Sequence, residues 1–83
     1  MGKGIFGIVW LKDWAQTADG RQIIGYAGRV DFGAAEGNVK GGLMWASITG
    51  AKRNVQIQPP SILSVEWYED GLPEIKNTSV EVL

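Results

Sequence analysis

Hydrophobic and polar residues alternate along several short stretches of the chain. The clearest case is residues 21–32, where one face of an extended strand collects Ile24, Tyr26, Val30 and Phe32. The opposite face collects Ile23, Ala27, Arg29 and Asp31. Successive side chains of a strand point to opposite faces, so this alternation predicts β-structure. No stretch of 12 or more residues has the apolar spacing of a helix. We predict strands at residues 4–12, 21–32, 43–49, 55–58 and 63–68, with a short terminal strand at residues 80–82.

Glycine and proline residues mark where these strands turn and bend. Asp19-Gly20 is a typical turn dipeptide, and Pro59-Pro60 ends the fourth strand because proline has no N–H to give to a ladder. Gly25 and Gly28 lie inside the second strand and indicate sharp bending, which a small barrel needs to close on itself. We predict an all-β fold, a five-stranded and strongly bent small barrel that forms one domain over residues 1–83. The alternative is an open β-sandwich fragment that a neighbouring chain completes.

The composition limits how such a barrel is stabilised. A chain of 83 residues allows one domain, and a domain of this size buries only about 60% of its unfolded surface. There is no cysteine and no histidine, which removes disulfides and disfavours a zinc site. Partner subunits are the remaining common means of stabilisation. With 45% hydrophobic residues and four tryptophans, the chain is expected to form a homo-oligomer.

The charge and the length of the apolar runs restrict the partners. The formal net charge is -1, so the chain lacks the basic footprint of a protein that binds long duplex nucleic acid. The first residues lack the charged region and the apolar stretch of a signal peptide. No segment approaches the roughly 18 apolar residues of a membrane span. We therefore expect a cytoplasmic protein with no membrane partner.

Side-chain catalysis is not expected. Nucleophilic catalysis needs a nucleophile beside a base, and the chain has neither cysteine nor histidine. The carboxylates of Glu69 and Asp70 precede Gly71 in a pattern that is typical of a solvated turn. No glycine-rich phosphate loop or dinucleotide-binding pattern is present. The sequence therefore predicts no catalytic residue, no cofactor and no metal site.

Aromatic and basic residues are the better candidates for binding. Four tryptophans and two tyrosines can serve either as core residues or as stacking platforms for bases. Trp14 stands apart because it lies in a polar stretch, residues 14–18, that is expected to be a loop. The densest basic cluster of the chain is Lys52 and Arg53, followed by Asn54. This cluster is either a solvated hairpin turn or a site that contacts phosphate.

One segment, from Asp19-Gly20-Arg21 through Asp31 to Asn38, resembles the first signature of Sm-like proteins. That signature combines a D-G-R turn with a strand, an aspartate and an asparagine. Residues 48–50 and 54–57 are similar to a divergent form of the second signature. The resemblance implies a five-stranded bent barrel that assembles into rings through strand pairing between neighbours. It also implies single-stranded RNA, rich in uridine or adenine, as the ligand.

The same resemblance implies a set of RNA-binding residues. Asp31 would orient Asn38, and Asn38 would hydrogen-bond the edge of a base. Phe32 would stack on a base, and the phosphate would lie near the cluster formed by Lys52, Arg53 and Asn54. We therefore expect a homo-oligomeric ring without enzymatic activity that binds single-stranded RNA or a related ligand.

Two other interpretations stay open. One is a structural or protein-interaction module that binds no nucleic acid and is encoded by a phage or mobile element. The near-neutral net charge favours this interpretation. The other rests on residues 22–26 and 55–59, which are similar to two stretches of the plasmid-borne type II dihydrofolate reductases. Those proteins are small barrels that form a tetramer around one central pore. This second resemblance implies hydride transfer from a nicotinamide cofactor.

Overall fold

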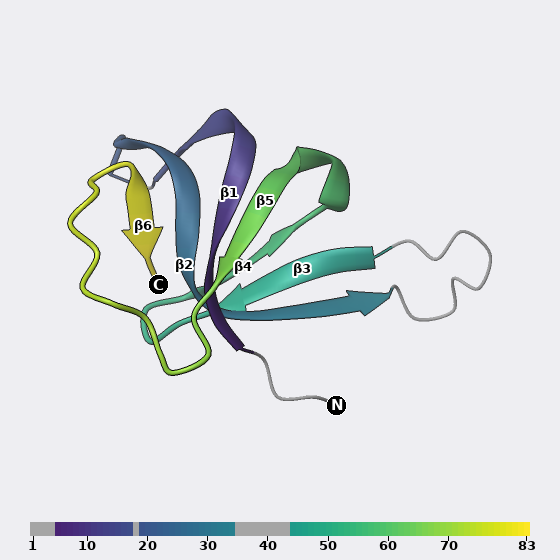
Figure 1. The fold of residues 1–83 in the computed structure, drawn as a ribbon. Coiled ribbons are helices and arrows are strands. Elements are labelled where there is room, and N and C mark those ends of the chain that lie inside the picture. The colour runs from purple at the N-terminus through teal and green to yellow at the C-terminus, as the bar shows by residue number, and fades with distance from the viewer. Residues whose placement is uncertain (1–4, 18, 35–43) are drawn as a thin grey trace.

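The computed structural model describes residues 5–17, 19–34 and 44–83 (Figure 1). Most of them form the strands β1 (Ile5–Gln16), β2 (Gln22–Ala34), β3 (Met44–Thr49), β4 (Asn54–Ile57), β5 (Ile62–Trp67) and β6 (Val80–Val82). A 3-10 turn, η1 (Pro59–Ser61), joins β4 to β5 where two consecutive prolines remove backbone donors. The prediction of an all-β fold is confirmed. None of the described residues belongs to a helix with the length and apolar character that crossing a membrane requires.

One sheet contains all of these strands. Its order is β4-β3-β2-β1-β5 with antiparallel pairing, and β6 adds to β2 in parallel. Along one edge β2 pairs with β1, and along the other it pairs with β6 over residues 25–27 and with β3 over residues 29–34. The sheet bends strongly (Figure 1). Within the described part of the chain its outermost strands, β4 and β5, do not pair with each other, so the barrel stays open.

The inner face of the bent sheet encloses the main hydrophobic core. Its buried members are Val9, Leu11, Ile23, Tyr26, Val30, Ile48, Ile57 and Leu83. Tyr26 and Val30 belong to one face of β2, as the alternation predicted. Ile23 joins them, although the alternation placed it on the opposite face. The pairing of β1 with β2 is irregular at this point, since the register shifts between Trp10 and Ala15 and Ala15 pairs with Ile23 beyond the shift.

The strand β1 continues to Gln16, whereas the sequence predicted a loop over residues 14–18. Its last two residues pair with the start of β2 beyond the register shift. The strand was not recognised because residues 12–16 are exposed or partly exposed on both faces, so no alternation of buried apolar and exposed polar side chains marks it. Trp14 lies on the irregular part of β1 and is 57% exposed.

The opposite face of β1 and β2 is covered by the C-terminal segment. After β5 the chain passes around this part of the sheet and returns as β6 (yellow in Figure 1). A second buried cluster forms there from Ile8, Ala27 and Val80, and around it pack Trp10, Tyr68, Leu72 and Ile75. The Glu66 carboxylate ties this layer together, since it accepts hydrogen bonds from the Trp10 indole (3.3 Å) and the Tyr68 hydroxyl (2.7 Å). The middle of β1 is therefore buried on both faces, as its apolar sequence predicted.

Two glycines that face each other across β1 and β2 allow the sheet to bend. Gly7 pairs with Gly28. A Cβ at Gly7 would lie 2.8 Å from the backbone oxygen of Glu66 on β5, and a Cβ at Gly28 would lie 2.8 Å from that of Thr49 on β3. Both distances are well below the optimal separation of non-bonded atoms, about 3.5–4.0 Å. The neighbouring strands can therefore approach only because both side chains are absent.

The strand β6 and the residue after it fill the edge of β2 that β3 leaves unpaired. Leu83 donates its backbone N–H to the Ala27 carbonyl (2.9 Å), and its own carbonyl accepts from the Lys52 N–H (3.2 Å). The Leu83 side chain is buried in the main core. Gly50 permits this arrangement, because a Cβ there would overlap the backbone of Leu83. The β3–β4 turn is thereby bonded to the C-terminal strand.

Gly28→Ala is expected to destabilise the fold by about 1–3 kcal/mol, the usual cost of overpacking a tight core. The added methyl group would meet the Thr49 carbonyl and the Ile48 side chain. Urea denaturation measures the free energy of unfolding of variant and wild type. The control is Ser64→Ala on exposed β5 surface, which should change this free energy by less than about 0.5 kcal/mol. Equal effects of the two substitutions would contradict the packing argument.

Candidate functional site

A polar cavity of about 540 Å³ opens between three segments that are distant in the sequence. They are the β1–β2 turn, the β3–β4 turn and the C-terminal segment that leads into β6. The basic residues in its lining are Arg21, Lys52, Arg53 and Lys76, and the acidic ones are Asp19 and Glu81. We call it the cationic cavity, because four basic against two acidic groups leave a local positive excess in a chain of net charge -1.

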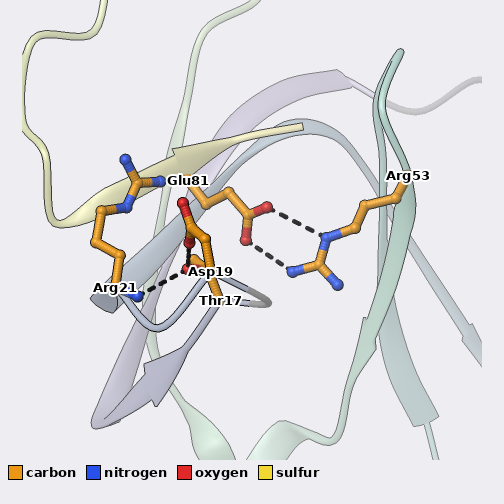
Figure 2. Close-up of polar contacts among 5 residues, drawn as sticks. All are labelled: Thr17, Asp19, Arg21, Arg53 and Glu81. Atoms are coloured by element: carbon orange, nitrogen blue, oxygen red, sulfur yellow. Dashed lines mark hydrogen bonds and ion pairs between the residues drawn. The ribbon is translucent and has the colours of Figure 1, made fainter.

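The β1–β2 turn is tied together by Thr17 (Figure 2). The Thr17 N–H donates to the Arg21 carbonyl (2.8 Å), and the Gly20 N–H donates to the Thr17 carbonyl (3.0 Å). The Thr17 hydroxyl accepts from the Arg21 N–H (3.0 Å) and donates to the Asp19 carboxylate. Gly20 has a φ of 87°, a left-handed conformation that suits glycine. The turn therefore fixes the backbone of Arg21 at the wall of the cavity.

Arg53 is held in place by Glu81 of β6 (Figure 2). Its Nη2 and Nε atoms donate to the two carboxylate oxygens at 2.7 and 3.2 Å, which makes the ion pair two-pronged. The hydrogen bonds to Glu81 are the main reason why the pKa of the Arg53 guanidinium is raised, and nearby Tyr26 contributes to the rise. Among the described residues, no ion pair engages the other three cations of the cavity, Arg21, Lys52 and Lys76. Arg21 nevertheless lies near enough to Asp19 to help lower the pKa of that carboxyl.

A second cavity, of about 330 Å³, is lined mainly by residues of β1 and by residues 55–58 of β4 and its end. Asp13 and Trp14 of β1 line it on one side, and Gln56 and Gln58 line it from β4 and the residue after it. The apolar part of the lining includes Leu11, Val55 and Ile57. We call it the Trp14 cavity. Tyr26 also lines this cavity, and it contributes to the raised pKa of Arg53 in the cationic cavity.

The structure places two of the predicted phosphate contacts, Lys52 and Arg53, in the cationic cavity. Asn54 follows them as the exposed first residue of β4. Arg21 and Lys76 join these residues, although neither was predicted to contact a ligand. Arg21 could have been found, since it belongs to the Asp-Gly-Arg turn motif. Lys76 stands alone in a polar segment, so no local pattern indicated it.

Asp31 and Phe32 lie further along β2 and line neither cavity. They pair with residues 47 and 46 of β3, whereas the β3–β4 turn follows residue 49 at the other end of that strand. Asp31 is half-buried, and the 47% exposed Phe32 contacts Trp67 edge to face with ring centroids 5.9 Å apart. Adjacent positions of a strand face opposite sides, so the two residues do not share a face. Asn38, the remaining member of the predicted set, lies outside the described residues.

An NMR titration of the Asp19 carboxyl is expected to give a pKa below the usual aspartate value, chiefly because the Thr17 hydroxyl donates to it. Since the folded pKa is the lower one, the stabilisation from this carboxylate is present above about pH 4 and is lost as the pH falls through the folded pKa. Thr17→Val should raise the pKa of Asp19 toward the usual value. The matched control is Thr78→Val in the same cavity, which should leave it unchanged. An unchanged pKa in Thr17→Val would contradict the assignment.

The lysine and arginine side chains of the cationic cavity are suited to bind an anion such as phosphate through charge-assisted hydrogen bonds. In residues 5–17, 19–34 and 44–83, no group of three or more His, Cys, Asp or Glu side chains comes together as a metal site would require. Comparison of this chain with models of known protein families, with curated proteins and with solved structures found no match.

Proposed function

We propose that the protein is a homo-oligomeric small barrel that binds single-stranded RNA, with the cationic cavity as its phosphate site. The observation that carries this proposal is the gathering of four basic side chains from three distant segments around one cavity. The chain as a whole has a net charge of -1, so the positive region is a local feature and not a consequence of composition. A local excess of this kind is the usual electrostatic footprint of a phosphate-binding surface.

The arrangement of the charges suits a ligand that offers few phosphates at a time. Three cations have no ion-pair partner among the described residues, and Arg53 presents a guanidinium that Glu81 has already oriented. A long duplex is bound along an extended basic face. Single-stranded RNA is recognised through base stacking and base edges as well as charge, so a compact cationic site is sufficient.

Self-association is supported by the two outermost strands of the sheet, β4 and β5. In the described part of the chain, β4 pairs with β3 alone and β5 pairs with β1 alone, so each has one edge whose backbone groups lack a strand partner. Such edges readily pair with another chain. Leu63 of β5 is 66% exposed, which places a large apolar side chain on one of these strands. Pairing of β4 with a neighbour's β5, repeated from copy to copy, is a head-to-tail contact that forms a ring when the rotation between neighbours closes.

Lys52→Gln and Lys76→Gln are each expected to weaken the binding of oligo(U) or oligo(A), because each removes one phosphate contact. In a plot of log K against log salt concentration, each substitution should make the slope shallower by about 0.7, the value for one charge on a single strand. Fluorescence anisotropy of short labelled oligonucleotides at several salt concentrations measures the affinity and the slope.

The matched control for these variants is Lys12→Gln. Lys12 is exposed on β1 and lines neither cavity, so the substitution removes the same charge from another place and should leave the slope unchanged. Equal losses in all three variants would mean that binding follows the net charge and not the cavity. Absence of binding by the wild type would reject RNA as the ligand and favour a structural or protein-interaction module.

Leu63→Lys is expected to break the assembly into monomers, because a charged side chain on an edge strand opposes pairing with a neighbour. Light scattering of wild type and variant measures the native mass, and circular dichroism checks that the variant is folded. Glu69→Lys, in the exposed turn after β5, is the control that adds a lysine without touching the strand. A wild-type mass equal to that of one chain would overturn the proposed assembly.

A further inference from the structure

The Trp14 cavity has the composition of a site for a flat, polar ring system. Trp14 offers an indole that is 57% exposed, an unusual degree of exposure for so large an apolar side chain. Gln56 and Gln58 bring amide groups, each of which can donate and accept hydrogen bonds. Leu11 and Ile57, both buried, belong to the apolar part of the lining. An aromatic ring with amides over apolar side chains is able to recognise both the face and the edge of a nucleobase.

The backbone of β1 explains why Trp14 is presented at this cavity. The ladder between β1 and β2 is interrupted between Trp10 and Ala15, and Trp14 lies inside the interruption. Residues in such an irregularity are released from the strict alternation of a strand, and irregularities of this kind re-aim side chains beside binding sites. The core does not need the Trp14 side chain, since the buried members of β1 in the main core are Val9 and Leu11.

Two stretches of the chain contribute residues to both the Trp14 cavity and the cationic cavity. From β1 into the following turn, residues 13–15 line the Trp14 cavity and residues 17, 19 and 21 line the cationic one. From the β3–β4 turn into β4, residues 52–53 line the cationic cavity and residues 55–58 line the Trp14 cavity. A strand rises about 3.3 Å per residue, so only about 10 Å of chain separate positions 53 and 56. Adjoining nucleotides of one strand can span this distance.

We propose that the Trp14 cavity binds a nucleobase, which stacks on Trp14 and is hydrogen-bonded by Gln56 and Gln58 while the cationic cavity holds the neighbouring phosphate. This inference rests on the proposed RNA binding and adds to it the place where a base is held. The remaining exposed aromatic side chains on the described surface, Phe6, Phe32 and Trp67, line neither cavity. Trp67 is therefore a suitable control for an exposed tryptophan outside the site.

Uridine and adenosine are the direct probes, because each carries the base without a phosphate. In two-dimensional ¹H–¹⁵N NMR spectra, either nucleoside should shift the indole signal of Trp14, which the Trp14→Phe variant identifies. Trp14→Ala should weaken nucleoside binding by about tenfold or more, as expected for the loss of base–aromatic stacking. Gln56→Leu keeps the size of the side chain and should also weaken binding. Equal shifts with ribose alone would overturn base recognition.

A comparison of oligo(U) with an abasic strand of equal length separates the base site from the phosphate site. The wild type should bind oligo(U) more tightly, and Trp14→Ala should remove this advantage without changing the salt slope, whereas Trp67→Ala should preserve it. If both strands bind equally and both depend on Lys52 and Lys76, the phosphate site stands and the base site is overturned. If nucleosides need Trp14 but Lys52→Gln and Lys76→Gln have no effect, the base site stands and the cationic cavity is rejected.

The assembly state provides a further outcome that would overturn the inference. The Trp14 cavity lies along β4, the strand whose free edge is proposed to meet a neighbouring copy. If Trp14→Ala changed the native mass in light scattering while the wild type showed no nucleoside-dependent shift, the cavity would be a contact between subunits and not a base site. An unchanged mass together with lost nucleoside binding supports the base site.

Discussion

The close approach of strands at Gly7 and Gly28 determines the shape of the sheet. At Gly28 the outer edge of β2 changes its partner from β6 to β3, and opposite it, at Gly7, β5 passes close to β1. A methyl group at Gly28 would push away β3, which carries the core residue Ile48, and one at Gly7 would push β5 away from β1. In a chain of 83 residues the core is small, so one such opening affects the whole fold. The glycines also increase the entropy lost on folding, and the burial of β1 on both faces offsets that cost.

The C-terminal segment connects this core to the candidate site. Val80 packs into the second buried cluster, with Ile8 and Ala27, and Leu83 packs into the main core. Glu81, between them, forms hydrogen bonds with Arg53. Lys76, from the same segment, adds a cation to the cavity. The residues that complete the fold at the edge of β2 are thus the residues that build one wall of the cationic cavity. Any loosening of β6 would release Arg53 and widen the cavity at the same time.

Local patterns in the sequence predicted the strands well because burial and alternation are properties of neighbouring residues. The alternation correctly placed Tyr26 and Val30 on one face of β2, and Asp19-Gly20 correctly marked a turn. The position of Ile23 was not predictable in this way, because Ile23 lies where the pairing with β1 shifts register and simple alternation no longer applies. Nor was the parallel pairing of β6 with β2, because a strand of three residues has too little alternation to specify a partner. Register and partner choice are tertiary properties.

Only part of the candidate site was predicted from the sequence, because the rest depends on which distant segments the fold brings together. Lys52 and Arg53 are adjacent in the sequence, so their charge was visible as a cluster. Lys76 joins them only because the C-terminal segment returns to β2, and no alternation or spacing encodes that return. The resemblance to Sm-like proteins implied Phe32 as a stacking residue, yet its ring packs against Trp67 and it does not line the cationic cavity. The topology decides which distant segments come together. Only the basic residues on those segments form a site.

The Arg53–Glu81 pair places an acidic group beside a basic one inside the proposed phosphate site. The pair removes one net charge from the cavity, and because Arg53 is well exposed it adds little to stability. Its contribution is geometric: the guanidinium is oriented before any ligand arrives, and the β3–β4 turn is linked to β6. Around this fixed group lie two lysines, whose flexible stems can follow a ligand of variable shape. One oriented arginine with two adaptable lysines suits the backbone of a single strand, whose phosphates, unlike those of a duplex, have no fixed spacing.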